Sequence, residues 1–145
     1  MTRALIEAVE RFTEPHDKAQ LQRLEEAIGT IRPENCRQPE FQALLSVFER
    51  FPEDDGFGVF WSIVHCLEAS EGYEPALIES VNRCPAEFNL LMINRLINGG
   101  VTEIEGQVLL SLLASAASNP LASGLARKSA QSFIEYQRKQ RHTDA

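Results

Sequence analysis

The positions of its prolines constrain the fold of this 145-residue chain more than any other sequence feature. Five of the seven prolines immediately precede a stretch whose apolar residues recur at helical spacing: Pro15, Pro39, Pro75, Pro85 and Pro120. Proline suits the first turn of a helix, because its missing N–H would have had no partner there. Glycine or asparagine falls where these stretches end, at Gly29, at Gly72 and in the run 98–100. The sequence therefore predicts a succession of helices.

These signals divide the chain into about eight helices. The predicted ranges are 2–12, 16–29, 39–50, 56–70, 74–83, 86–97, 103–118 and 121–140. The segment 102–105 (Thr-Glu-Ile-Glu) has the form of a capping box and marks the start of the seventh helix. No run of alternating β-branched residues is bounded by a hairpin dipeptide. We expect an all-α fold of mostly antiparallel helices in a single domain over 1–145, with a frayed tail at about 140–145.

A weak internal repeat occurs at a spacing of 33 residues. The segment 43–45 (Ala-Leu-Leu) recurs as 76–78 (Ala-Leu-Ile), and Arg50 and Pro52 recur as Arg83 and Pro85. The ranges 39–70 and 74–97 then read as two helix pairs stacked in one direction, as in a short HEAT-like solenoid. An irregular bundle is the alternative. In either case the helix at 86–97, which is apolar on nearly all sides, is expected to be buried among the other helices. The helix at 16–29 is expected at the surface of the domain.

Composition and charge exclude several classes of protein. The chain is 43% hydrophobic with a net charge of −7, which disfavours a general nucleic-acid binder and RNA binding through the basic C-terminal helix. No uncharged apolar run approaches the ~20 residues that a membrane span needs. Glu7 interrupts the N-terminus before a signal-peptide core could form. The three cysteines have no CxxC or zinc-ligand spacing. We therefore expect a cytoplasmic protein with free thiols, no metal and no cofactor.

The negative charge is concentrated in the middle of the chain. Residues 53–105 contain ten acids and two bases, a net charge of −8, so the rest of the chain has a net charge of +1. Many of these acids fall in first helical turns, where the helix dipole alone favours them. If the helices alternate in direction, the starts at 56 and 86 share one end of the molecule, and the starts at 74 and 103 share the other. Two acidic ends would attract a basic macromolecule.

A second stripe on the helix at 56–70 is a candidate binding surface. Gly58, Trp61, Ser62, His65 and Glu68 lie opposite the apolar pair 59 and 63. Trp and Arg amid polar groups are typical of protein-binding hot spots. The alternative is a Trp61 that belongs to the core, with its N–H on a carbonyl. Through the 33-residue repeat, the predicted surface consists of Trp61, His65, Asn94, Arg95 and Asn98.

Few residues could converge for catalysis. His65 and Cys66 are adjacent, but consecutive helical residues point about 100° apart and cannot form a nucleophile–base pair directly. A hydrolase or transferase that uses Cys66 or Cys84 with His65 remains an alternative. No GxSxG, Walker A, GxGxxG, HExxH or EF-hand pattern occurs. The carboxylates at 53–55 read as a helix cap and loop. The sequence therefore does not predict an enzyme.

Three segments carry a resemblance to a known family. They are 55–68 with 72–74, 83–85 (Arg-Cys-Pro), and 92–99 (Met-Ile-Asn-Arg-Leu-Ile-Asn-Gly). Over about 40–115 the chain resembles the small all-helical immunity proteins of bacterial polymorphic-toxin and contact-dependent inhibition systems. The resemblance implies a cytoplasmic inhibitor without catalysis that occludes a toxin domain, and an acidic inhibitor suits a basic nuclease toxin.

The toxin-binding residues are predicted from charge and from the second stripe, since that family diverges at its binding face. A HEAT-like adaptor for a host protein or peptide, bound near Trp61, is the main alternative. The predicted toxin-binding residues are Glu53, Asp54, Asp55, Trp61, His65, Glu68, Glu71, Glu74, Glu79, Asn94, Arg95 and Asn98.

Overall fold

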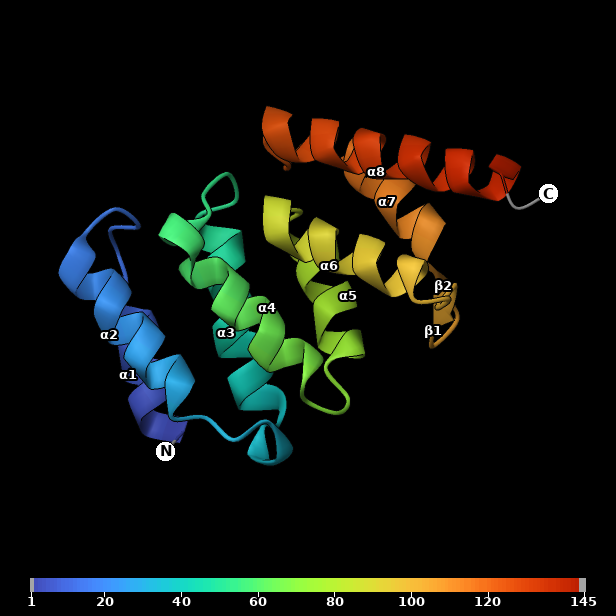
Figure 1. Cartoon of the computed structure of the whole chain (residues 1–145). Helices are drawn as coiled ribbons and strands as arrows, with labels where there is room; N and C mark the ends of the chain where they lie inside the picture. The colour runs from blue at the N-terminus through green and yellow to red at the C-terminus, as the bar shows by residue number, and fades with distance from the viewer. Residues whose placement is uncertain (1, 144–145) are drawn as a thin grey trace.

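The computed structural model describes residues 2–143, which form eight α-helices and one small hairpin (Figure 1). This confirms the predicted all-α fold class. The hairpin strands are β1 (Glu103–Ile104) and β2 (Gln107–Val108), and two short 3-10 helices, η1 (Pro33–Asn35) and η2 (Gly56–Gly58), precede α3 and α4. The α-helices are α1 (Thr2–Arg11), α2 (Lys18–Gly29), α3 (Gln38–Arg50), α4 (Val59–Glu68), α5 (Glu74–Arg83), α6 (Glu87–Asn98), α7 (Leu109–Ala117) and α8 (Gly124–Thr143).

The helices are arranged as four stacked pairs in two layers. Each odd-numbered helix packs on the following even-numbered one, and the odd-numbered helices pack on one another in order, α1 on α3, α3 on α5 and α5 on α7. The even-numbered helices form the second layer, which lies in front in Figure 1. The two helix pairs predicted from the 33-residue repeat are therefore neighbours in the middle of the stack. This arrangement matches a short solenoid better than an irregular bundle.

A cluster of phenylalanine rings joins the first three pairs at one end of the core. The ring of Phe60 on α4 lies 5.7 Å from that of Phe48 on α3, 5.7 Å from that of Phe88 on α6 and 6.2 Å from that of Phe12. All four rings are buried and belong to one contiguous cluster of buried residues. The expected placements also hold, because α6 packs on both helices of the second pair and both helices of the fourth pair, whereas α2 packs only on α1 and α4 among the strongest contacts.

Gly56 begins the turn that leads into α4 and cannot be replaced by a larger residue without strain. Its φ is +57°, and an added Cβ would lie 2.6 Å from Cδ1 of Phe60, whose ring is fixed in the core. We expect Gly56→Ala to lower the free energy of unfolding by about 2 kcal/mol, measured by urea denaturation. The control is Gly29→Ala, because nothing lies within 4 Å of a Cβ added there. Equal stabilities for the two variants would contradict this reading.

The predicted start of the seventh helix is wrong. Residues 103–108 form an antiparallel hairpin with Glu103 opposite Val108, and α7 begins only at Leu109. The two turn residues, Glu105 and Gly106, have φ of +47° and +83°, which is typical of a type I′ turn. The expected capping box at 102–105 therefore does not exist. The dipeptide Glu-Gly is not one of the usual hairpin signals, although Gly106 supplies the positive φ.

Other boundaries differ from the prediction by a few residues. The predicted helix at 56–70 opens with the 3-10 turn η2, and α4 itself covers Val59–Glu68. The last helix begins at Gly124, after a turn in which the Ser123 hydroxyl accepts the Ala126 N–H. It continues through Thr143, into the range where a frayed tail is expected, and 144–145 lie outside the described residues. None of the described helices is long and apolar enough to cross a membrane.

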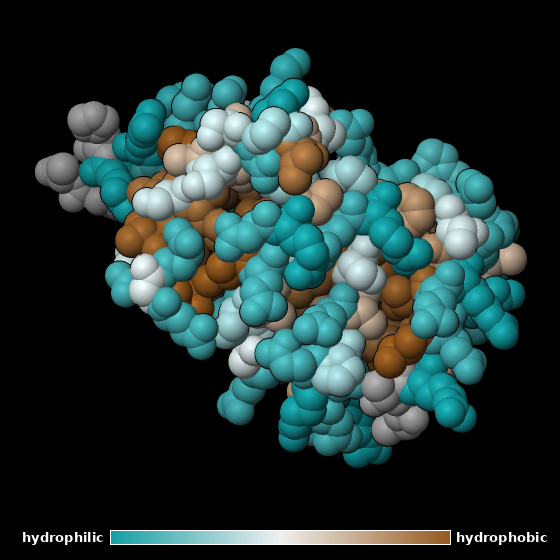
Figure 2. Space-filling model, turned by 180° about the vertical axis from the view of Figure 1, so that it is seen from behind, coloured by the Kyte–Doolittle hydropathy of each residue, from teal (hydrophilic) through white to brown (hydrophobic). Residues whose placement is uncertain are grey.

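Exposed apolar side chains gather in the last helix pair and near the start of α4. Seen from behind, most of the surface is polar, and the largest apolar area lies toward the C-terminal end (Figure 2). Among the described residues, four of the six exposed large apolar or aromatic side chains fall within 108–136, namely Val108, Leu121, Leu125 and Tyr136. The other two are Phe57 and Trp61. Trp61 and Leu125 line the candidate site described below, and Phe57 contacts His16, which also lines it.

Candidate functional site

A groove of about 700 Å³ lies where α4, α6 and α8 begin. The backbone N–H of Glu87 donates to the carbonyl of Pro52 (2.8 Å) and ties the start of α6 to the loop before α4. The predicted convergence of the helix starts near 56 and 86 is therefore confirmed. The groove is lined by His16, Glu53, Asp54, Asp55, Trp61, Glu87, Phe88, Leu91 and Leu125.

Three of the four carboxylates in the groove are held in place by hydrogen bonds. Oδ1 of Asp54 accepts the N–H of Gly56 (3.0 Å), and Oδ1 of Asp55 accepts the N–H of Phe57 (3.0 Å). The carboxylate of Glu87 accepts the Ser129 hydroxyl (2.7 Å). Asp54 and Asp55 therefore bond locally as the cap and loop that the sequence predicted. The same residues also line the groove. A carboxylate that caps a turn keeps further acceptor positions free, so it can still bind a partner.

His16 connects the α1–α2 loop to the groove. Its Nε2 lies 2.9 Å from Oδ2 of Asp54, and its ring centroid lies 5.3 Å from that of Phe57. Phe57 is 72% exposed. The loop before α4 therefore presents carboxylates and an aromatic ring together.

Apolar side chains also line the groove. Trp61 is 38% exposed and meets the buried Phe88 ring edge-on at 5.5 Å. Leu91 is half-buried, and Leu125 in the first turn of α8 is 44% exposed. The interpretation of Trp61 as a core residue is wrong, since more than a third of its surface meets solvent. The groove is thus lined by both apolar side chains and carboxylates.

Trp61 also lies on a second surface, shared by α4 and α6. The His65 ring lies 5.9 Å from the indole, and the guanidinium of Arg95 lies over the indole at 5.8 Å. Arg95 donates two hydrogen bonds to the Glu68 carboxylate, at 2.8 and 2.9 Å, and these raise its pKa. The predicted grouping of Trp61, His65 and Arg95 is confirmed. Because Glu68 is already paired, it offers less negative charge to a partner than the sequence suggests.

Asn94 and Asn98 do not belong to this surface, which corrects the prediction of a shared one. Both side chains accept hydrogen bonds from the Gln137 amide of α8, at 2.7 and 2.8 Å. Asn94 is buried. The two asparagines therefore attach α8 to α6, and Asn98 remains exposed. The helical period places residues 94, 95 and 98 close together on α6, but it does not determine which neighbouring helix each side chain contacts.

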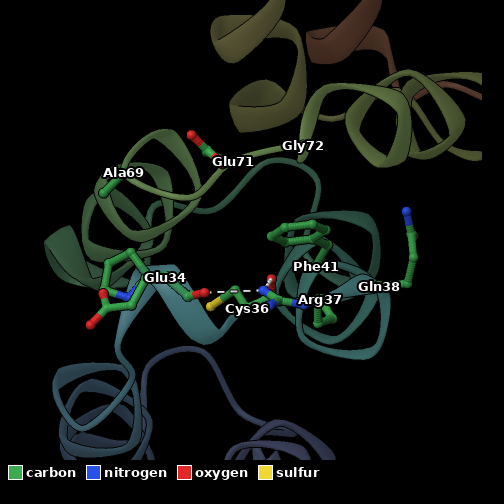
Figure 3. A pocket seen from close by; sticks show the side chains of 9 residues that line it. Glu34, Cys36, Arg37, Gln38, Phe41, Ala69, Glu71 and Gly72 are labelled. Atoms are coloured by element: carbon green, nitrogen blue, oxygen red, sulfur yellow. Dashed lines mark hydrogen bonds between the residues drawn. The ribbon is translucent and has the colours of Figure 1, made fainter.

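The remaining predicted acids lie away from the groove. Glu71, on the α4–α5 loop, lines a second cavity of about 700 Å³ across from Arg37 (Figure 3). Arg37 donates to the backbone carbonyls of Glu34 and Cys36, at 3.0 and 2.9 Å. This cavity therefore has mixed charge. The expected acidic end at 74 and 103 is not formed as predicted, because 103 lies in a hairpin strand and does not begin a helix.

Two further acids lie beside other charged or ionisable groups. Burial, followed by the charges of Glu74 and Glu68, raises the pKa of Tyr73 to about 12, so each of these two carboxylates lies near the Tyr73 side chain. Glu79 is exposed on α5 and lies near Arg83, which forms an ion pair with Glu49 (2.7 Å). Neither Glu74 nor Glu79 lines the groove.

Five groove residues were not among the predicted toxin-binding residues. Glu87 could have been included, since it is an acid in a first helical turn whose start was expected at this end. Nothing in the sequence places Leu125 beside Trp61, because the two are 64 positions apart and only the fourth helix pair brings them together. The missed residues are His16, Glu87, Phe88, Leu91 and Leu125.

The cysteine chemistry considered from the sequence finds little support. Burial raises the pKa of Cys66 to about 12, with a smaller contribution from Cys36. Burial also raises the pKa of Cys84. Both thiols stay protonated near neutral pH, and the thiolate is the nucleophilic form. Residues 2–143 contain no group of three or more His, Cys, Asp or Glu side chains that could hold a metal ion.

Comparisons with family models, with curated proteins and with solved structures find no match to this chain.

Proposed function

We propose that this protein is an immunity protein that binds and neutralises a cognate bacterial toxin domain by occluding it, without catalysis. The observation that carries the proposal is the groove at the starts of α4, α6 and α8, which combines four carboxylates with apolar side chains that include Trp61. Exposed aromatic residues surrounded by polar groups are typical of binding hot spots. An acidic surface suits a basic toxin domain, such as a nuclease that must itself bind nucleic acid.

The scaffold supports this proposal through its rigidity. The four stacked pairs share one contiguous core, and hydrogen bonds hold Asp54 to the N–H of Gly56 and Glu87 to the Ser129 hydroxyl of α8. A preformed surface loses little conformational entropy on binding, so more of the interaction energy appears as affinity. An inhibitor that must capture a toxin before it acts also gains from electrostatic steering, which raises association rates by ~10–10³-fold.

A HEAT-like adaptor for a host protein or peptide is the second candidate. The stacked helix pairs favour it, because repeat solenoids commonly present extended binding surfaces. The two proposals differ in the partner. Co-expression with a toxin domain encoded beside the gene should restore growth if the protein is an immunity protein. An adaptor would give no protection and would bind a housekeeping protein instead.

The electrostatic part of the proposal predicts a strong salt dependence. We expect the association rate constant with the toxin domain to fall ~10-fold or more between about 50 and about 500 mM NaCl, as measured by stopped-flow mixing. The dissociation rate constant should change much less, because salt screens the approach of the partner more than buried contacts. An association rate that is indifferent to salt would contradict a role for the acidic groove in steering.

A further inference from the structure

We propose that the groove at the starts of α4, α6 and α8 receives a short segment of the partner that carries arginine or lysine beside an apolar side chain. The aliphatic stem of the basic residue lies along Trp61 and Leu91, and its cationic head meets the carboxylates that line the groove. This inference rests on the proposed function and specifies the chemistry of the partner at one site.

The shape and lining of the groove match a side chain that is itself apolar along its stem and charged at its tip. The groove is lined by the apolar side chains of Trp61, Phe88, Leu91 and Leu125 and by the carboxylates of Glu53, Asp54, Asp55 and Glu87, which form its acidic rim. Arginine and lysine bury their methylene stems on apolar surface while the head group remains in a polar setting. A volume of about 700 Å³ exceeds that of one side chain, so a segment of two or three residues fits.

The lining of the groove supplies little positive charge to its carboxylates. No lysine or arginine is among the residues that line it, and His16, the one basic side chain there, lies 2.9 Å from Asp54. Three acids elsewhere have an arginine nearby. Glu68 is paired with Arg95, Glu49 is paired with Arg83, and the cavity that contains Glu71 also contains Arg37. A cation from a partner therefore gains more at Glu53, Asp55 and Glu87, which have no lysine or arginine among the lining residues.

Trp61 is the only tryptophan of the chain and reports directly on the groove. We would titrate the protein with the blocked peptide acetyl-Ala-Arg-Leu-Arg-Ala-amide and follow its fluorescence. The control peptide carries citrulline, the neutral analogue of arginine, at both basic positions. We expect saturable binding of the arginine peptide that is at least ~10-fold tighter than that of the citrulline peptide, because only arginine carries charge to the rim.

Matched variants locate the binding. Glu53→Gln combined with Glu87→Gln should weaken binding of the arginine peptide at least ~10-fold, since it removes two rim charges and keeps both side-chain shapes. Glu71→Gln combined with Glu74→Gln changes the net charge equally at a distance and should stay within ~2-fold. Leu125→Ser should weaken binding, whereas Leu121→Ser, at a 79% exposed position that does not line the groove, should not.

The same variants separate this inference from the proposed function when they are tested against the toxin domain. Equal weakening by both glutamate pairs, or no preference for the arginine peptide, would overturn the inference. A toxin domain that binds the Glu53/Glu87 variant as tightly as the wild-type protein would also overturn it and would leave the proposed function standing. Binding of the arginine peptide in the groove without any binding or neutralisation of the toxin domain would support the basic-segment site and overturn the proposed function.

Discussion

Phe60→Ala is expected to lower the free energy of unfolding by about 4 kcal/mol, at the upper part of the range for large core aromatics. The Phe60 side chain is fully buried and lies within 6.2 Å, centroid to centroid, of the rings of Phe12, Phe48 and Phe88. Alanine would leave a cavity between three helix pairs that the stacked helices cannot easily close. Urea denaturation followed by circular dichroism measures the loss.

The variant also affects the candidate site, because Phe88 lies between Phe60 and Trp61. We expect a shifted Trp61 fluorescence spectrum in the folded Phe60→Ala protein. The control is Phe57→Ala, which removes a ring that is 72% exposed and should change stability by less than ~0.5 kcal/mol. A loss below ~1.5 kcal/mol for Phe60→Ala would contradict the central position that the structure assigns to this ring.

Asn89→Ala is expected to cost about 3 kcal/mol of stability, because it breaks three hydrogen bonds in a fully buried place. Oδ1 of Asn89 accepts the Ala86 N–H (2.8 Å), and Nδ2 donates to the Ser80 hydroxyl (3.1 Å) and the Cys84 carbonyl (3.0 Å). The same bonds fix the first turn of α6, which carries Glu87 and Phe88 into the groove. Thermal and urea denaturation give the change.

The control for this prediction is Asn82→Ala, which removes an exposed asparagine from the neighbouring helix α5 and should be nearly neutral. Asn89→Asp keeps the acceptor but loses the donor and adds a charge in a buried place, so it should also destabilise the protein strongly. If both Asn89 variants unfold at the same denaturant concentration as Asn82→Ala, the buried network contributes little, and the position of α6 is maintained by apolar packing alone.

Helix positions could be predicted from the sequence because their signals are local. Pro39 and Pro75 lie in the first turns of α3 and α5, as expected, and Gly29 is the last residue of α2. The hairpin at 103–108 was missed, since its strands have only two residues each and its turn uses Glu105 at a positive φ. The pattern at 102–105 predicted a helix start instead, and Gly106 was the only residue in the segment that indicated a turn.

The candidate site was predicted in part. The acids at 53–55 and Trp61 do line one groove, because alternating helices bring the loop before α4 to the start of α6. Asn94 and Asn98 were misassigned, since residues on one side of α6 meet two different neighbours, α4 through Arg95 and α8 through Gln137. Glu68 was expected as a free contact acid and is paired with Arg95.

By itself, the sequence determined that the chain is helical, roughly where each long helix lies, and that its negative charge is concentrated between 53 and 105. These properties follow from local backbone preferences and from composition, which need no knowledge of distant residues. Only the tertiary structure decided which acids pair with an arginine of this chain and which apolar side chains line the same groove as the others. Packing sets those pairings, because it brings Leu125 of the last helix pair to Trp61 of the second and places Arg95 on Glu68.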